Sequence, residues 1–111
     1  MTTISEDYVV RQIEMIGELI TKALNLKVES RFNEALGVLD QAMKEMFGQQ
    51  ADLLEMVDAH TAASLIGDPT KIKTYADLIK TKVDLLSDVK SLSRLRKRYE
   101  QLYEEALRLS N

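Results

Sequence analysis

Apolar residues recur at intervals of three and four along almost the whole chain, and this spacing constrains the fold more than any other feature. On an α-helix, which turns about 100° per residue, it places the apolar side chains on one face. The chain has one proline and four glycines among 111 residues, so few positions interrupt a helix. We therefore expect a single all-α domain over residues 1–111, in which about five amphipathic helices pack as antiparallel hairpins.

The expected helices are bounded by capping residues, glycine and proline. They run, in chain order, from Thr3 or Ser5 to about Leu26, from Ser30 to Phe47, over 49–67 as two short pieces or one bent helix, from Asp68-Pro69 onward, and from Ser91 or Leu92 to Leu109. Asp68 followed by Pro69 is a strong start signal, because a capping side chain precedes proline at the first helical position. The break before the last helix is inferred from Ser87, Asp88, Ser91 and Ser93, and one long helix across this point is the alternative.

The composition excludes several classes of site. The chain has no cysteine, which rules out disulfides, cysteine-ligated zinc, iron–sulfur clusters and thiol nucleophiles. Its formal charge of −3 gives no general affinity for polyanions. No apolar run approaches the roughly 18 residues of a membrane span, and the N-terminus is acidic where a secretory signal would be basic. We expect a soluble protein of the cytoplasm with no membrane partner.

The first predicted helix carries more apolar surface than one neighbour can cover. Its apolar arc spans about 220°, far wider than a single core-facing stripe. The excess predicts a second contact, either a homodimer seam or a surface that receives an amphipathic helix of a partner protein. The residues that we expect to make it are Val10, Ile13, Ile16 and Ile20. Gly17 lies near the edge of this arc, where close approach of another helix would explain a residue that costs up to about 1 kcal/mol relative to alanine.

Two segments of the chain are similar to each other. With Ala42 aligned to Ala106, FNEALGVLDQAMKEM from Phe32 and RYEQLYEEALRL from Arg98 share an acid or amide before alanine and an aliphatic residue after it. Both resemble the second helix of a tetratricopeptide repeat (TPR), without the usual repeat period or the closing proline. The whole chain resembles a family of small uncharacterised bacterial proteins, mainly Gram-positive, with TPR-like helical hairpins. That resemblance implies a TPR-like helical bundle and supplies no activity or site residue.

One conspicuous charge cluster opens the last predicted helix, and it consists of Arg94, Arg96, Lys97 and Arg98. The dipole disfavours cations at a helix N-terminus, and such local conflicts tend to occur at functional sites. The cluster is interpreted first as an ordinary solvated face, then as a site for an acidic protein partner, and last as a nucleic-acid site. Nucleic acid is disfavoured because Glu100 follows closely and no aromatic residue interleaves the cations.

No catalytic, cofactor-binding or metal-binding constellation is found. The single histidine, His60, has no cysteine or second histidine with which to complete a zinc site. The acidic pairs Glu14–Glu18 and Glu100–Glu104 fall on polar helix faces, and the dispersed glycines form no phosphate loop. We therefore predict a non-enzymatic protein–protein interaction module, an adaptor or scaffold, without a cofactor or small-molecule ligand. The alternative is a nucleic-acid-binding helical protein that uses the basic cluster.

Overall fold

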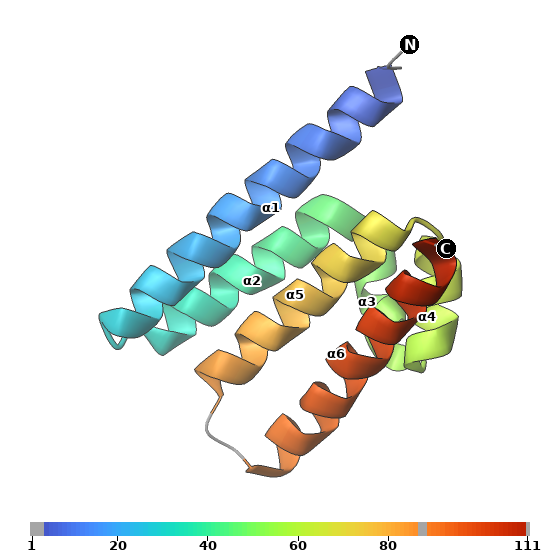
Figure 1. The fold of residues 1–111 in the computed structure, drawn as a ribbon. Coiled ribbons are helices and arrows are strands. Elements are labelled where there is room, and N and C mark those ends of the chain that lie inside the picture. Colours follow the sequence, from blue (N-terminus) through green and yellow to red (C-terminus); the bar gives the residue numbers. More distant parts are fainter. Residues whose placement is uncertain (1–3, 87–88, 111) are drawn as a thin grey trace.

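The backbone is helical almost throughout in the computed structural model, which describes residues 4–86 and 89–110 (Figure 1). These ranges contain six α-helices and no strand, which confirms the all-α prediction. The helices are α1 (Ile4–Val28), α2 (Phe32–Phe47), α3 (Gln50–Met56), α4 (Ala59–Ile66), α5 (Pro69–Leu85) and α6 (Val89–Ser110). The segment expected as two short pieces or one bent helix therefore forms two short helices. Within the same ranges, no helix combines the length and the apolar content that crossing a bilayer requires.

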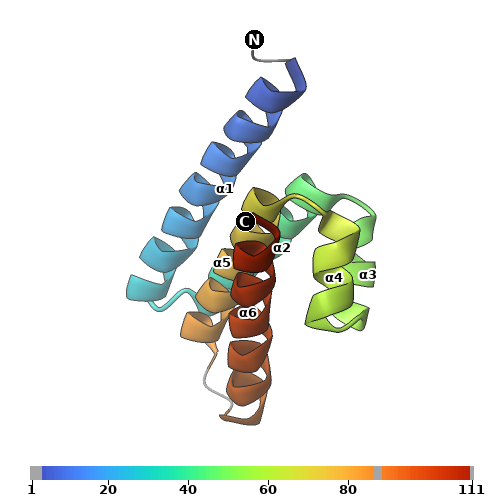
Figure 2. The ribbon, with the colours of Figure 1, turned by 45° about the vertical axis from the view of Figure 1, so that its right-hand side comes forward.

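Two long antiparallel hairpins form the body of the fold. Helix α1 pairs with α2, and α5 pairs with α6 (Figure 1). Helix α5 also packs against both α1 and α2, so the hairpins lie side by side in one bundle. The short helices α3 and α4 lie on the side away from α1, and α4 packs against α5 and α6 (Figure 2). The described bundle measures 45 × 26 × 24 Å along its principal axes.

Helix α5 contributes to two clusters of buried side chains. The first cluster joins α1, α2 and α5, and it contains Ile16 and Leu78. The second joins α5 and α6 to the short helices, and it contains Tyr75 and Leu102. Phe47 of α2 packs against both clusters, with its ring edge-on to Tyr75 at 5.2 Å between the ring centroids. Because α5 and Phe47 belong to both clusters, the two hairpins share one continuous core.

The start of α5 agrees with its sequence signal. The Asp68 carboxylate accepts a hydrogen bond from the backbone N–H of Thr70 at 2.8 Å, and Pro69 is the first helical residue. This cap satisfies one of the backbone N–H groups that a helix leaves unpaired at its N-terminus. Helix α1 begins at Ile4, and Thr3, whose capping-box spacing predicted this start, lies outside the described residues.

The last two helices are separate, as the sequence predicted. Helix α5 ends at Leu85 and α6 begins at Val89. Of the four residues from which the break was inferred, Ser87 and Asp88 lie outside the described residues, and Ser91 and Ser93 lie within α6. Helix α6 thus begins before Ser91, the earliest predicted start, and the basic cluster falls beyond its first turn. The conflict with the helix dipole is correspondingly weaker than expected, because the dipole effect falls off within the first turn.

A tight turn built on Ser30 connects α1 to α2. The Arg31 N–H donates to the Leu26 carbonyl and the Ser30 N–H donates to the Lys27 carbonyl, both at 2.9 Å. These two bonds form the Schellman pattern that closes many helices, in which glycine usually occupies the left-handed position. Here that position is Ser30, with φ = 61°. The left-handed conformation costs a residue with a Cβ atom roughly 1–2 kcal/mol, so this turn is strained.

We expect Ser30→Gly to raise the free energy of unfolding by about 0.5–1 kcal/mol, because glycine adopts a positive φ without strain but loses more entropy on folding. Urea denaturation followed by circular dichroism measures this change. Ser30→Val is the opposing control, and it should lower stability because a β-branched side chain is poorly tolerated at positive φ. A glycine variant no more stable than the wild type would contradict the assignment of strain to this turn.

Candidate interaction surfaces

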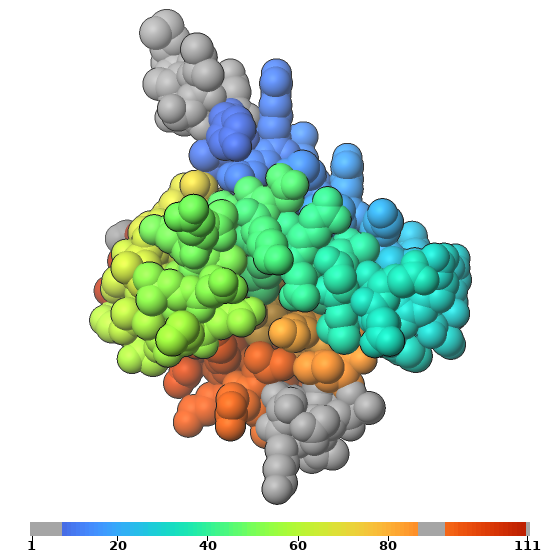
Figure 3. All heavy atoms as spheres, turned by 180° about the vertical axis from the view of Figure 1, so that it is seen from behind, coloured from blue at the N-terminus to red at the C-terminus, as the bar shows by residue number. Residues whose placement is uncertain are grey.

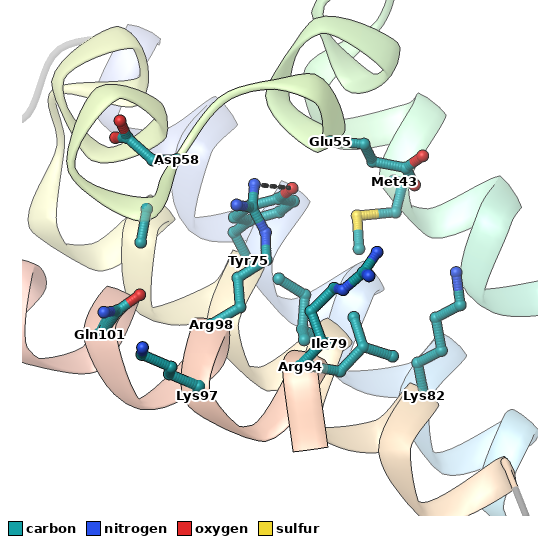
Figure 4. Close-up of a pocket in the computed structure, with 12 residues that line it drawn as sticks. Met43, Glu55, Asp58, Tyr75, Ile79, Lys82, Arg94, Lys97, Arg98 and Gln101 are labelled. Carbon is teal, nitrogen blue, oxygen red and sulfur yellow. Dashed lines mark hydrogen bonds between the residues drawn. The ribbon is translucent and has the colours of Figure 1, made fainter. Parts of the chain in front are cut away.

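A cleft opens between the α5–α6 hairpin and the short helices α3 and α4 (Figure 4). It encloses about 510 Å³, and Met43 of α2 lines it as well. The floor is apolar, since Tyr75 and Ile79 of α5 are almost fully buried and Leu95 of α6 is half-buried. A volume of this order, with an apolar floor, is typical of clefts that bind ligands.

The rim of the cleft is charged, and the two signs are segregated. Lys82, Arg94 and Lys97 come from the hairpin, whereas Glu55 and Asp58 come from the opposite wall (Figure 4). Arg94 and Lys97 are exposed, and Lys82 is half-buried. In the part of the chain that the structure describes, none of these three cations forms an ion pair. One side of the cleft therefore presents three cations to solvent above an apolar floor.

Arg98, the fourth cation of the cleft, is engaged within the chain. Its guanidinium donates to the backbone carbonyls of Leu54 and of Val57, the latter at 2.7 Å, and to the Tyr75 hydroxyl at 3.3 Å. The carbonyls at a helix C-terminus have no intrahelical partner, and Arg98 supplies donors to this end of α3. Contrary to the sequence expectation, Arg98 directs its hydrogen-bond donors to its own chain and fastens α3 to α6.

The basic cluster is therefore not a single site. Arg94 and Lys97 face the cleft, but Arg96 lies about 200° around the helix from Arg94 and is exposed outside it. Lys82, which the sequence did not single out, joins Arg94 and Lys97 because α5 and α6 run antiparallel. The antiparallel pairing of these two helices was predicted from the sequence, and that pairing brings Lys82 close to the cations of the last helix. No sequence pattern indicated that Glu55 would face the same cleft, because its position depends on how α3 packs.

The four residues expected to make a second contact on α1 are divided in a similar way. Ile16 is fully buried and belongs to the core, because it faces both α2 and α5, so it cannot contact a partner. Ile13 and Ile20 are partly buried beside the same cluster. Val10 is 54% exposed. The expectation is therefore corrected at Ile16, while Val10, Ile13 and Ile20 retain solvent-facing surface.

The N-terminal part of α1 extends beyond α2. The Gln12 side chain donates to the Glu45 carbonyl at 3.0 Å, near the C-terminal end of α2. Seen from behind, the preceding part of α1 rises above α2 (Figure 3). Tyr8 is 64% exposed there. Helix α2 does not reach this part of α1, so the apolar surface of Tyr8 and Val10 is open to solvent.

Gly17 has no packing partner within the described chain. No neighbouring atom lies within 4 Å of the position that a Cβ atom would take at Gly17. Close approach of another helix was the expected explanation for this glycine, and no helix of the described chain makes that approach. Gly37 of α2 is equally open. Each glycine weakens its helix by up to about 1 kcal/mol, and nothing inside the bundle offsets this cost.

Two further polar contacts, Tyr103 with Asp77 and His60 with Glu105, connect α6 to α5 and to α4. The Tyr103 hydroxyl donates to the Asp77 carboxylate, and burial together with this acceptor raises the pKa of Tyr103 far above its ordinary value. His60 Nδ1 lies 3.0 Å from a Glu105 oxygen, and a hydrogen bond from Arg108 lowers the pKa of that same carboxyl. Among the described residues, no three His, Asp or Glu side chains are grouped to hold a metal ion.

Arg98→Ala should lower the free energy of unfolding by about 2 kcal/mol, because it removes charged donors from half-buried carbonyls. Arg96→Ala is the matched control on the same helix, and as an exposed substitution it should change stability by less than about 0.5 kcal/mol. Urea titration of both variants measures the difference. Equal stability of the two variants would show that the Arg98 contacts contribute nothing to the fold.

Asp58 gives the fold a dependence on pH. The Thr61 backbone N–H donates to its carboxylate at 2.7 Å, and this bond lowers the pKa of Asp58 below its ordinary 3.8. The stabilisation is complete above pH 3.8 and is lost as the pH falls through the lowered pKa. Asp58→Asn keeps a capping oxygen that does not titrate. We expect the stability advantage of the wild type over this variant to shrink between about pH 5 and about pH 2, measured by urea titration. A constant difference would contradict the cap's role.

Comparisons with known proteins assign no function to these surfaces. No protein-family model matches the chain, and searches of curated proteins and of solved structures find no match either. The two surfaces share no residue, because every residue that lines the cleft belongs to α2–α6 or to the turn before α4.

Proposed function

We propose that the protein is a non-enzymatic interaction module, built from two TPR-like hairpins, that associates with a second copy of itself through one face of α1. We call this face the outer seam, and it consists of Val10, Ile13, Gly17, Ile20, Leu24 and Val28. The observation that carries the proposal is this apolar stripe, which is exposed at Val10, Leu24 and Val28 and follows α1 over a length of about 27 Å. Ile13 and Ile20 are only partly covered.

The outer seam has the spacing of a helix–helix interface. From Val10 to Leu24 its members alternate by three and four residues, which is the pattern of positions a and d in a coiled coil. Val28 is 85% exposed, Val10 54% and Leu24 37%. Scattered exposed apolar residues are normal, but exposed residues aligned on one helix face, with partly covered isoleucines between them, indicate an interaction surface.

Gly17 lies at the middle of the outer seam, and a second helix would account for it. A glycine lets another backbone approach closely, which the open space around Gly17 permits. In an antiparallel pair, Ile20 of the other copy can occupy this space, in the manner of a knob in a hole. The cost of a helix-interior glycine would then be offset by packing between two chains.

The charges of α1 favour a second, antiparallel copy as the occupant. From Tyr8 to Ile20, α1 carries Glu14 and Glu18 against the single base Arg11, and the part from Thr21 onward carries Lys22 and Lys27. An antiparallel pair sets the acidic half of each copy against the basic half of the other, whereas a parallel pair opposes like charges. A symmetric interface of this kind is the commonest arrangement of soluble homo-oligomers.

The hairpins themselves support the broader assignment. Each TPR-like segment lies in the second helix of a hairpin, one in α2 and one in α6. Ala42 and Ala106, the aligned alanines, are both buried at helix contacts. The intervening α3 and α4 lengthen the spacing between the two segments beyond that of a regular repeat. The lack of cysteine supports placing the module in the cytoplasm.

Light scattering over a concentration series tests self-association. We expect the mass to rise from that of one chain to that of two, and Val10→Glu and Leu24→Glu to hold it at one chain. Both residues are exposed in the single chain, so these variants should fold and keep the wild-type circular dichroism. A wild type that stays monomeric at every concentration up to its solubility limit would refute the proposal.

A pair of glycine variants isolates the contribution of the outer seam. Gly17→Leu fills the space that the second helix requires, so it should weaken association by at least about tenfold, or about 1.4 kcal/mol. Gly37→Leu is the matched control, because Gly37 is equally open but lies on the polar side of α2, and it should leave association unchanged. If both variants associate like the wild type, the seam is not the interface.

A further inference from the structure

We propose that the cleft between α3–α4 and the α5–α6 hairpin binds an acidic segment of a partner protein, with an apolar side chain of that segment on the cleft floor. This site is separate from the outer seam, and it does not depend on self-association. The cations, the floor and the opposite wall of the cleft together define the chemical class of the partner.

Three cations define the charge of the ligand. Lys82, Arg94 and Lys97 come from two antiparallel helices and line the same side of the cleft (Figure 4). None of them forms an ion pair with any described residue, whereas Arg98, beside them, is held by backbone carbonyls. The positive charge of Arg98 is thus fixed inside the site as a background field. Carboxylates of a ligand would meet the other three cations at the rim.

Because the floor of the cleft is apolar, a well-fitting ligand has an apolar side chain between its carboxylates. Ile79 is 4% exposed, and Met43 and Leu95 are half-buried around it. A leucine-sized side chain of a ligand would cover the remaining apolar surface, and removing that surface from water favours binding. A purely ionic ligand would leave that surface wet. An acidic segment with one apolar residue uses both parts of the cleft.

The same features disfavour nucleic acid. The floor aromatic, Tyr75, is 1% exposed, so no base can stack on it, and single-stranded nucleic acids depend on such stacking. Glu55 and Asp58 on the opposite wall would repel phosphates. A peptide avoids this repulsion, because it can place carboxylates toward the cations and backbone N–H groups toward the acidic wall. The net charge of −3 adds no long-range attraction for a polyanion.

Selection from a random peptide library displayed on phage, with the full chain as bait, tests the proposal. We expect enrichment of peptides that carry Asp or Glu on both sides of an apolar residue. The double variant Arg94→Glu/Lys97→Glu should lose this enrichment. Arg96→Glu is the matched control, because it makes the same charge change on the same helix outside the cleft, and it should retain the enrichment.

Fluorescence anisotropy of a labelled selected peptide then quantifies the site. The double variant should weaken binding at least about tenfold, which is about 1.4 kcal/mol, while Arg96→Glu should leave it within about twofold. Val10→Glu should bind like the wild type, which separates this site from the outer seam. Circular dichroism checks that each variant is folded.

Several outcomes would overturn the proposal. They are the absence of enrichment, enrichment of basic or uncharged peptides, and an equal loss of binding in Arg96→Glu and in the double variant. A labelled single-stranded oligonucleotide provides the competing readout. If it binds the wild type more tightly than the selected peptide does, and the double variant loses it, the cleft is a nucleic-acid site instead.

Discussion

The packing of α5 is the interaction on which the rest of the structure depends. This helix meets α1 and α2 on one side and α4 and α6 on the other, and only a polar stripe that includes Lys73 and Lys80 is exposed to solvent. Leu78 joins the first cluster of buried side chains, and Tyr75 and Ile79 join the second, within a span of five residues. Burying apolar surface in both directions is what unites the two hairpins. Loss of α5 packing would therefore expose both clusters at once and not merely separate one hairpin from the other.

The helices could be predicted from the sequence because their signals are local. Asp68-Pro69 announces α5 within two residues, and apolar spacing marks the long helices within a few turns. The partners of Arg98 could not be predicted in this way, since Leu54 and Val57 are 44 and 41 residues distant in the chain. The burial of Ile16 could not be predicted for the same reason, since it depends on neighbours that are distant in the chain. The wide apolar arc of α1 indicated two covered sides, but only the packed neighbours decide that Ile16 faces inward and Val10 outward.

The candidate sites follow from the same geometry. A helix distributes consecutive residues around its axis, so a cluster that is compact in sequence is dispersed in space. Arg98 turns inward to α3, Arg94 and Lys97 turn to the cleft, and Arg96 turns away from it. Antiparallel packing adds Lys82 from a different helix. A run of charged residues in the sequence is therefore a weak guide to a binding site until the neighbouring helices are known. A binding site needs charged residues that lie on the same surface, whichever helix they come from.

The contacts of Arg98 also bear on how the cleft can change in evolution. Two of its three acceptors are main-chain carbonyls, of Leu54 and Val57, which every amino acid supplies. Substitutions along α3 therefore leave the attachment of this helix in place as long as the helix itself forms. Glu55, between the two anchored carbonyls, can acquire a different charge or size without moving the wall on which it stands. The wall formed by α3 is thus attached through its backbone, and the charge on this side of the cleft can vary while the fold remains the same.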